Sequence, residues 1–168
     1  MERLAELYKK WKGALPEKAE ELPQSGSNRK YYRLTDKAGE SVIGGVGTRR
    51  DENHTFIYLT KHFSSRRLPV PHILAVSKDE LRYLQTDLGN TSLFDALRGG
   101  RESGGRYNQK EKQLLTNVIR ELPNIQIRGA RGLDWKYCYP QPEFDVDSVL
   151  FDLNYFKYCF LKATELDF

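Results

Sequence analysis

Hydrophobic positions follow a helical period at the start of this chain. Leu4, Leu7 and Trp11 recur at helical spacing among charged residues in the segment 2–12. This pattern predicts an amphipathic helix that ends near Gly13, because glycine commonly terminates helices.

The period then shortens to that of β-strands. Short runs rich in aromatic and β-branched residues are separated by turn-forming residues, which predicts strands. One expected strand ends near residue 26, and the others cover residues 30–34, 41–43, 72–76 and 81–85. A helix that either Thr48 or Asp51 can cap, and that is predicted to end near Arg67, separates the third strand from the fourth.

The second half of the chain returns to helical spacing. We expect a short helix over residues 92–97, followed by a flexible glycine-rich loop over 99–105. Longer helices are predicted over 108–122 and 148–166, with an irregular aromatic segment over 129–147 between them. Apolar residues occur on several sides of the last helix, so we expect it to be buried. Strands followed by helices predict an α+β fold.

Composition narrows the class of protein. The chain has 168 residues, of which 39% are hydrophobic and 30% charged, and its net charge is +4. No segment has the apolar length needed to cross a bilayer and the N-terminus lacks a signal-peptide pattern, so we expect no membrane contact and a cytoplasmic location. Basic and acidic residues are interspersed, which favours an anionic ligand over a DNA duplex.

Cysteine and histidine indicate no chemistry of their own. Cys138 and Cys159 have no C-x-x-C spacing and stand in aromatic surroundings, so we expect buried thiols. His54, His62 and His72 are scattered, and their spacing does not predict a shared metal. The sequence therefore predicts no metal site and no catalytic residue of these types.

A stretch of small residues leads directly into a basic, aromatic strand at QSGSNRKYYRL, which begins at Gln24. Ser25, Gly26 and Ser27 allow close approach of the backbone to an anion, with N–H groups that bind it. Arg29 and Lys30 add positive charge beside that loop. The pattern predicts a phosphate-covering hairpin, although an ordinary turn has the same composition.

The order of elements and four stretches of sequence resemble a known family. Three strands, a helix, two strands and a link into helices is the order of the small lobe of the protein-kinase-like fold. Gly26 to Leu34 is similar to the Gly-Ser-x-Arg-x-Tyr-x-Arg-Leu hairpin of its aminoglycoside phosphotransferase and choline kinase branch. Matching stretches follow in order at residues 48–56, 68–71 and 83–89.

The resemblance implies a role for an acidic residue in the helix between the third and fourth strands. Glu52 takes the place of the glutamate that, in kinases, pairs with a lysine on the third strand and orients it toward phosphate. The alternative is an acid that is favoured by the helix dipole alone. The third strand and its end, residues 41–47, contain no lysine. Either Arg29 or Lys30 supplies the charge, or the site lacks it.

The resemblance also implies an architecture and a set of nucleotide-binding residues. Residues 1–89 would form a nucleotide lobe with a five-stranded antiparallel sheet and one main helix, and residues 90–168 would form a linker and the first helices of an incomplete large lobe. Residues 85–88 would meet the adenine through their backbone, with Thr86 where the family usually has an acid. The implied residues are Ser25, Gly26, Ser27, Asn28, Arg29, Lys30, Glu52, Gln85, Thr86, Asp87 and Leu88.

The catalytic motifs of the family do not occur in these residues. Neither an H-G-D-x-x-x-x-N loop nor a following metal-binding Asp is present, so Mg²⁺ would be bound by residues that this chain lacks. We expect the N-terminal portion of an ATP-dependent phosphotransferase that acts on a small-molecule hydroxyl, without catalysis by the fragment itself.

Other functions fit the same sequence. One is a complete, non-catalytic kinase-like binding module, which the missing lysine favours. Nucleic-acid binding ranks last, because strand alternation places Tyr31 and Tyr32 on opposite faces and buries at least one of them. The apolar helix over 148–166 also predicts self-association of the chain.

Overall fold

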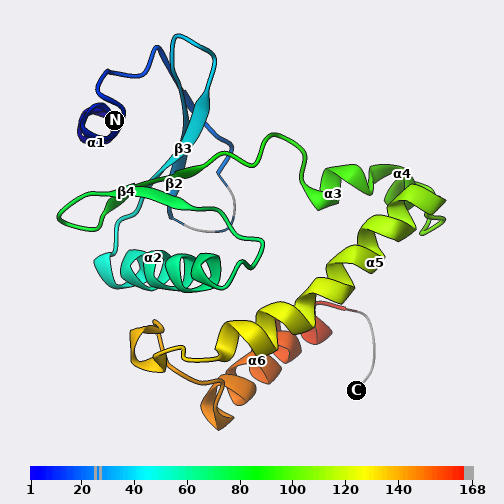
Figure 1. Cartoon of the computed structure of the whole chain (residues 1–168). Coiled ribbons are helices and arrows are strands. Elements are labelled where there is room, and N and C mark those ends of the chain that lie inside the picture. The colour runs from blue at the N-terminus through cyan, green and yellow to red at the C-terminus, as the bar shows by residue number, and fades with distance from the viewer. Residues whose placement is uncertain (25, 27, 165–168) are drawn as a thin grey trace. The chain divides into compact units, whose positions relative to one another are not determined.

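The protein has an α+β fold with one five-stranded antiparallel sheet. The computed structural model describes residues 1–24, 26 and 28–164. The strands are β1 (Lys18–Glu21), β2 (Lys30–Thr35), β3 (Ser41–Val46), β4 (Ile73–Val76) and β5 (Arg82–Thr86), and their order in the sheet is β1-β2-β3-β5-β4 (Figure 1). The predicted sheet and fold class are confirmed at this level. The first strand was expected to reach residue 26 but ends at Glu21, with one further backbone bond from the N–H of Leu22 to the carbonyl of Tyr31 at 2.8 Å.

Six α-helices accompany this sheet in the described part of the chain. The predicted first helix is α1 (Glu2–Lys12), which ends at Gly13 in the left-handed conformation with φ of 90°. The others are α2 (Arg50–Ser65), α3 (Leu93–Ala96), α4 (Arg98–Glu102), α5 (Gln109–Pro123) and α6 (Val146–Cys159).

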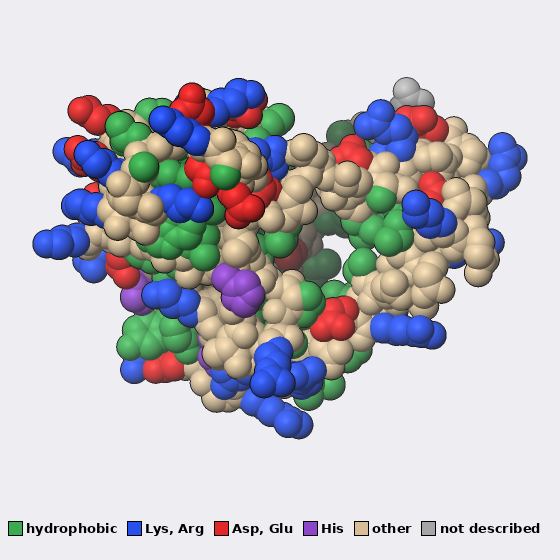
Figure 2. Space-filling view, turned by 45° about the horizontal axis from the view of Figure 1, so that its top comes forward, with side chains coloured by type: hydrophobic (Ala, Val, Ile, Leu, Met, Phe, Trp, Pro, Cys, Tyr) green, Lys and Arg blue, Asp and Glu red, His purple; other side chains and the backbone are tan. Residues whose placement is uncertain are grey.

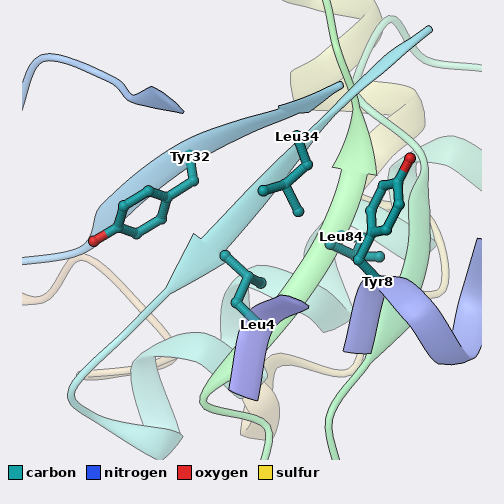
Figure 3. Close-up of a cluster of buried hydrophobic side chains, with 5 residues drawn as sticks. All are labelled: Leu4, Tyr8, Tyr32, Leu34 and Leu84. Carbon is teal, nitrogen blue, oxygen red and sulfur yellow. The ribbon is translucent and has the colours of Figure 1, made fainter. Parts of the chain in front are cut away.

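Helix α1 covers one face of the sheet. Its Leu4 and Tyr8 are buried together with Tyr32, Leu34 and Leu84 of the sheet, and these five side chains form the core cluster shown in Figure 3. Tyr32 therefore belongs to the core, as strand alternation predicted for at least one of the two tyrosines.

Helix α2 lies against the opposite face. Phe56 packs on Tyr83 with ring centroids 5.0 Å apart, and Tyr83 points away from its neighbour Leu84 because side chains alternate along β5. The buried positions of α2 are Asn53, Ile57 and Thr60, which share one side of the helix. A polar residue, Asn53, thus occupies the apolar side of α2.

Three glycines of β3 and its end allow side chains to approach the strand closely. A Cβ at Gly44 would lie 2.7 Å from Leu4 of α1, and one at Gly45 would lie 2.3 Å from the ring of Tyr83. A Cβ at Gly47 would lie 2.2 Å from Asn53 of α2. The space above these glycines is filled by the protein's own side chains.

The first part of the glycine-rich segment after α3 is helical, which corrects the loop expected over residues 99–105 for residues 99–102, whereas residues 103–105 form a turn. Helix α4 covers residues 98–102, and the backbone N–H of Gly100 donates to the buried carboxylate of Glu111 at 2.8 Å. Glu111 also closes a capping box with Asn108 at the start of α5. These fixed hydrogen bonds outweigh the conformational freedom of the glycines.

The chain divides into two compact units, residues 1–133 and 134–168. The boundary expected at residue 89 stays a prediction. In the second unit the apolar side chains of α6 are exposed, for example Phe151 at 69% and Phe156 at 49%, which corrects the burial expected for this helix. Its chief neighbour within that unit is a short 3₁₀ turn over residues 161–163, too small to cover it.

Two smaller expectations also change. Cys138 is half-buried and Cys159 is exposed, so neither is the buried thiol that their aromatic surroundings suggested. Cys159 is exposed because the short 3₁₀ turn over residues 161–163 does not cover helix α6. No helix in the described residues combines the length and apolar character that a membrane span requires.

Candidate functional site

A single arginine connects the hairpin, the sheet and helix α2. The guanidinium of Arg29, just before β2, donates to Glu52 Oε1 at 2.9 Å and to Asn53 Oδ1 at 3.1 Å, both on the first turn of α2. A third bond reaches the hydroxyl of Tyr31 at 3.3 Å. We call Arg29, Tyr31, Glu52 and Asn53, together with Phe56 and Tyr83, the Arg29 cluster.

Two aromatic rings enclose this guanidinium. Its central carbon lies 4.8 Å from the ring centre of Phe56 and 6.0 Å from that of Tyr83, distances at which cation–π attraction operates. The Arg29 side chain is 10% exposed, whereas that of Glu52 is 43% exposed. The positive charge is therefore fixed on three sides, and the acid beside it reaches solvent.

The surroundings of Arg29 keep it charged. Burial alone lowers the pKa of Arg29, but the hydrogen bond to Tyr31 and the nearby Tyr83, Tyr31 and Glu52 raise it above its ordinary value. Burial and the hydrogen bond to Tyr31 raise the pKa of the Tyr83 hydroxyl. Both groups keep one protonation state at neutral pH, so Arg29 is a permanent cation.

The fold fixes the cluster through close backbone approach. The side chain of Asn53 bridges Arg29 and the turn between β4 and β5, where its Nδ2 donates to the carbonyl of Glu80 at 2.9 Å. Gly47 leaves the room for this side chain, and Gly45 leaves the room for Tyr83. The space above these two glycines therefore holds Asn53 and Tyr83 and leaves no room there for a ligand.

The second basic residue of the hairpin lies elsewhere. The Nζ of Lys30 lies 3.1 Å from Glu21 of β1, and this contact raises the pKa of Lys30. Strand alternation directs Lys30 to the face opposite Tyr31. Of the two cations predicted to act together, only Arg29 contacts Glu52.

The hairpin tip is open where the structure describes it. Gly26 and Asn28 are exposed, and a Cβ at Gly26 would meet no atom within 4 Å. Nothing in the described residues therefore requires glycine there. Ser25 and Ser27, the other small residues predicted to bind phosphate, lie outside the described residues.

A second arginine of the same motif holds the end of β5. Arg33 Nε donates to Asp87 at 2.5 Å and its Nη2 donates to the other oxygen of Asp87 at 3.0 Å. Ser41 and the backbone N–H of Gly89 also donate to this carboxylate, at 2.7 and 2.9 Å. Hydrogen bonds from Arg33 above all, and also from Ser41 and Gly89, lower the pKa of Asp87 from 3.8 to about 2. The side chain of Asp87 is thus fully engaged within the protein.

The other predicted linker residues have unequal surroundings. Thr86 exchanges hydrogen bonds with the backbone of His72. Leu88 is 75% exposed, and its backbone N–H donates to no described residue. Gln85 Oε1 is buried without a hydrogen-bond partner in the described residues. A buried oxygen without a partner costs free energy unless a ligand or water donates to it.

Metal ligands do not gather in the described residues. No group of three His, Cys, Asp or Glu side chains there has a geometry that could hold a metal ion. The second unit contains a separate hollow of about 690 Å³ near Trp135, Pro140 and Phe151. Part of the aromatic segment 129–147, which was predicted to be irregular, lines this hollow.

Comparisons with known proteins leave the family open. No family model matches the chain. The mitochondrial import receptor subunit TOM40B of Bos taurus is 27% identical over 132 residues, which are 74% of this chain and 41% of that protein. The chain therefore spans less than half the length of this relative, and identity at this level does not establish common membership of a family.

The sequence did not indicate four members of the Arg29 cluster as parts of this site, namely Tyr31, Asn53, Phe56 and Tyr83. Phe56 and Tyr83 were expected only as apolar positions of a helix and a strand. The helical spacing of the sequence could have indicated Asn53, because it lies four residues before Ile57 and seven before Thr60, on the buried side of α2. A polar residue at such a position commonly binds another polar group.

Proposed function

We propose that this chain binds ATP as the nucleotide lobe of a phosphotransferase that acts on a small-molecule hydroxyl. The observation that carries the proposal is the Arg29–Glu52 ion pair at 2.9 Å. The acid of α2, expected from the family resemblance to orient a phosphate-binding cation, contacts a cation that comes from the hairpin instead of from β3. Arg29 then has the role that the missing lysine has in kinases.

Arginine is chemically suited to this role. Its guanidinium presents several donors in one plane and forms paired hydrogen bonds to phosphate oxygens. Arg29 already uses donors toward Glu52, Asn53 and Tyr31. We propose that phosphate takes over part of this coordination while Glu52 keeps the guanidinium oriented, and that the 43% exposure of Glu52 gives a ligand access to the pair.

The proposed base-binding segment is the end of β5 and the residues after it. The backbone N–H of Leu88, which donates to no described residue, would donate to the adenine edge. The buried Oε1 of Gln85 has no partner in the described residues, and the amino group of adenine is a donor that would supply one. Asp87 would act indirectly, since its carboxylate is occupied by Arg33.

Phosphoryl transfer is not part of the proposal for this chain alone. The sequence has no H-G-D-x-x-x-x-N motif, and the described residues gather no metal-binding group, so we derive no step through Mg²⁺. We expect nucleotide binding without turnover.

Calorimetry with the non-hydrolysable analogue AMP-PNP, with and without Mg²⁺, tests the proposal. We expect micromolar binding that weakens at least tenfold in Gly26→Ala and in Arg29→Lys. Gly26→Ala is informative because its Cβ meets no atom within 4 Å, so the variant should fold as stably as the parent. A methyl group there would obstruct only a ligand that approaches the backbone.

Lys30→Ala is the matched control. Lys30 is in the same hairpin but pairs with Glu21 on the other face, so its removal should change the affinity less than threefold. If AMP-PNP does not bind to the folded parent protein, or if Lys30→Ala weakens binding as much as Arg29→Lys, the proposed site is wrong.

One observation favours the alternative of a non-catalytic binding module. The glycines of β3 accommodate Asn53 and Tyr83 so closely that no lysine could stand at Gly45 without moving the Tyr83 ring. The protein is thus built without the usual kinase lysine. Binding of AMP-PNP by Arg29→Lys with the affinity of the parent, together with no loss in Gly26→Ala, would support this alternative.

A further inference from the structure

Positive charge gathers at the far end of α2 without acidic partners. Over much of the face shown in Figure 2, basic and acidic side chains lie side by side. Arg66 and Arg67 follow α2 directly, and Arg128 and Arg131 lie near the end of the first unit. None of these four forms an ion pair with a described residue. We call them the arginine patch.

Hydrogen bonds between the two segments bring the four residues together. Arg128 Nη2 donates to the carbonyl of Arg66 at 3.2 Å, and Arg66 Nη2 donates to the carbonyl of Arg131. His62 Nε2 lies 2.8 Å from the carbonyl oxygen of Gly129, which joins the same segments. The acceptors in these contacts are all main-chain oxygens, so the contacts leave the positive charges unbalanced.

The charge of the four arginines is large compared with the net charge of the chain. The chain has 27 Lys and Arg against 23 Asp and Glu, and removing the four arginines of the patch leaves 23 of each sign. The patch therefore equals the whole net charge of +4. Such a concentration attracts anions more strongly than the same charge dispersed over the surface.

The backbone conformation of Arg67 is a second feature of the patch. Among the described residues, Arg67 and Glu80 are the only residues other than glycine with positive φ, both at 56°. Side chains other than glycine rarely adopt this conformation, and they retain it where the surroundings compensate for its cost.

The backbone of Arg67 is stabilised by the turn that ends α2, where the N–H groups of Arg67 and Leu68 donate to the carbonyls of Ser64 and Phe63 at 2.9 and 3.1 Å. The side chains of Glu80 and Arg67 differ, because only that of Glu80 has partners among the described residues. Glu80 accepts from Arg50 at 3.1 Å, lies 3.0 Å from His54 Nδ1, and receives Asn53 at its carbonyl. The side chain of Arg67 is exposed and makes no hydrogen bond, ion pair or ring contact with a described residue. Glycine would suit the backbone of Arg67 better, and no contact within the described residues explains the arginine side chain there.

We propose that the arginine patch is a second anion site, specific for phosphate groups. Guanidinium groups form paired hydrogen bonds with phosphate oxygens, and two of them, Arg67 and Arg131, have all their side-chain donors free of described partners. The site is distinct from the Arg29 cluster. Helix α2 separates Glu52 from Arg66 by 14 residues, about 20 Å at the helical rise.

The test uses sodium tripolyphosphate titrated into the full chain by calorimetry, at low and at physiological salt. We expect binding that weakens at least fivefold in Arg67→Gly and in Arg131→Ala. Arg67→Gly should melt at the same temperature as the parent or higher, because glycine favours a φ of 56°. Loss of binding in that variant cannot then be attributed to unfolding.

Two matched controls assign the binding to the patch. Arg106→Ala removes an exposed arginine far from it in sequence, and Lys30→Ala removes a cation of the hairpin; each should change the affinity less than twofold. Equal weakening in Arg106→Ala would show that net charge alone binds the anion and would overturn the proposal. Loss in Arg29→Lys with no loss in Arg67→Gly would place the anion at the Arg29 cluster and would also overturn it.

The phosphate can belong to a free anion or to a lipid headgroup. Vesicles of phosphatidylcholine with and without phosphatidylglycerol, sedimented with the protein, distinguish these sources. Binding to tripolyphosphate without sedimentation indicates a soluble ligand, and sedimentation that Arg67→Gly abolishes indicates a headgroup. If neither probe binds, the patch is not a phosphate site. This test does not depend on AMP-PNP binding, which concerns the other end of α2.

Discussion

Two arginines of one hairpin, four residues apart, have different tasks. Arg33 binds Asp87, whose carboxylate receives further bonds from Ser41 and Gly89 and is 8% exposed. Arg29 binds Glu52, which receives no such set of bonds and is 43% exposed. The first pair joins β2 to the end of β5 and is closed to solvent. The second pair joins the residue before β2 to α2 and remains accessible on its acidic side.

The difference indicates what each pair can do. A buried ion pair whose every oxygen is bound stabilises the arrangement of the chain, and breaking it is costly. An ion pair with an exposed acid contributes little to stability, because water screens the acid, but its cation can exchange partners. Substitutions at the Arg33 pair should therefore alter folding, and substitutions at the Arg29 pair should alter ligand binding.

The largest effect is expected from Asp87→Ala. Removal of this carboxylate leaves Arg33 largely buried without its main partner and should lower the free energy of unfolding by about 3 kcal/mol. Urea denaturation at neutral pH measures the change. The matched control is Asp79→Ala, whose partner is also an arginine, Arg82, but whose carboxylate is 43% exposed, so the loss should stay below about 1 kcal/mol. Equal losses in the two variants would contradict the distinction.

Acid should break the same pair. The pKa of Asp87 is about 2 in the folded protein against 3.8 ordinarily, so its stabilisation is complete above about pH 5 and is lost as the pH falls through 2. The shift corresponds to about 2 kcal/mol. Asp87→Asn should lack this part of the acid dependence when unfolding is measured between neutral pH and pH 2. An Asp87→Asn profile parallel to that of the parent would show that Asp87 does not titrate in this way.

Gly45→Ala should disturb the Arg29 pair and spare the Arg33 pair. The added methyl would lie 2.3 Å from the Tyr83 ring, which closes the Arg29 cluster, so we expect a loss of about 1 to 2 kcal/mol through overpacking. Gly26→Ala, with open space at its Cβ, should cost a few tenths of a kcal/mol at most. Denaturation of both variants measures the difference. Equal stability of Gly45→Ala and the parent would show that Tyr83 is free to move.

The sequence predicted the fold of the sheet region well because its signals are local. Alternation and turn residues placed four of the five strands within a few residues of their observed bounds, and Gly13 ended α1 as expected. Helix α4 was missed because its glycines favour a loop, and the stabilising Glu111 is too far along the chain to influence a local pattern. Apolar residues on several sides of α6 indicated a buried helix. The sequence of one helix does not show, however, which other element would cover it.

The candidate site was predictable in part. The sequence identified Glu52 and left Arg29 and Lys30 as equal candidates for its partner. The choice depended on how the backbone leaves the hairpin, since Arg29 precedes β2 and its direction is not set by strand alternation. The contributions of Asn53 and Tyr83 depended on the glycines of β3, which leave room for side chains that come from distant parts of the chain.

A small effect on stability is expected from Glu52→Gln, and this variant is the most direct test of the comparison. Because the acid is 43% exposed, loss of its charge should lower the free energy of unfolding by less than about 1 kcal/mol. The affinity for AMP-PNP should nevertheless decrease, because the neutral amide of the variant would no longer hold the Arg29 guanidinium by charge. A double-mutant cycle with Arg29→Lys separates the two roles: coupling in binding without coupling in stability means that the pair orients a ligand-binding cation. Coupling in stability alone would make the Arg29 pair a structural contact like that of Arg33, and the two arginines would then share one task.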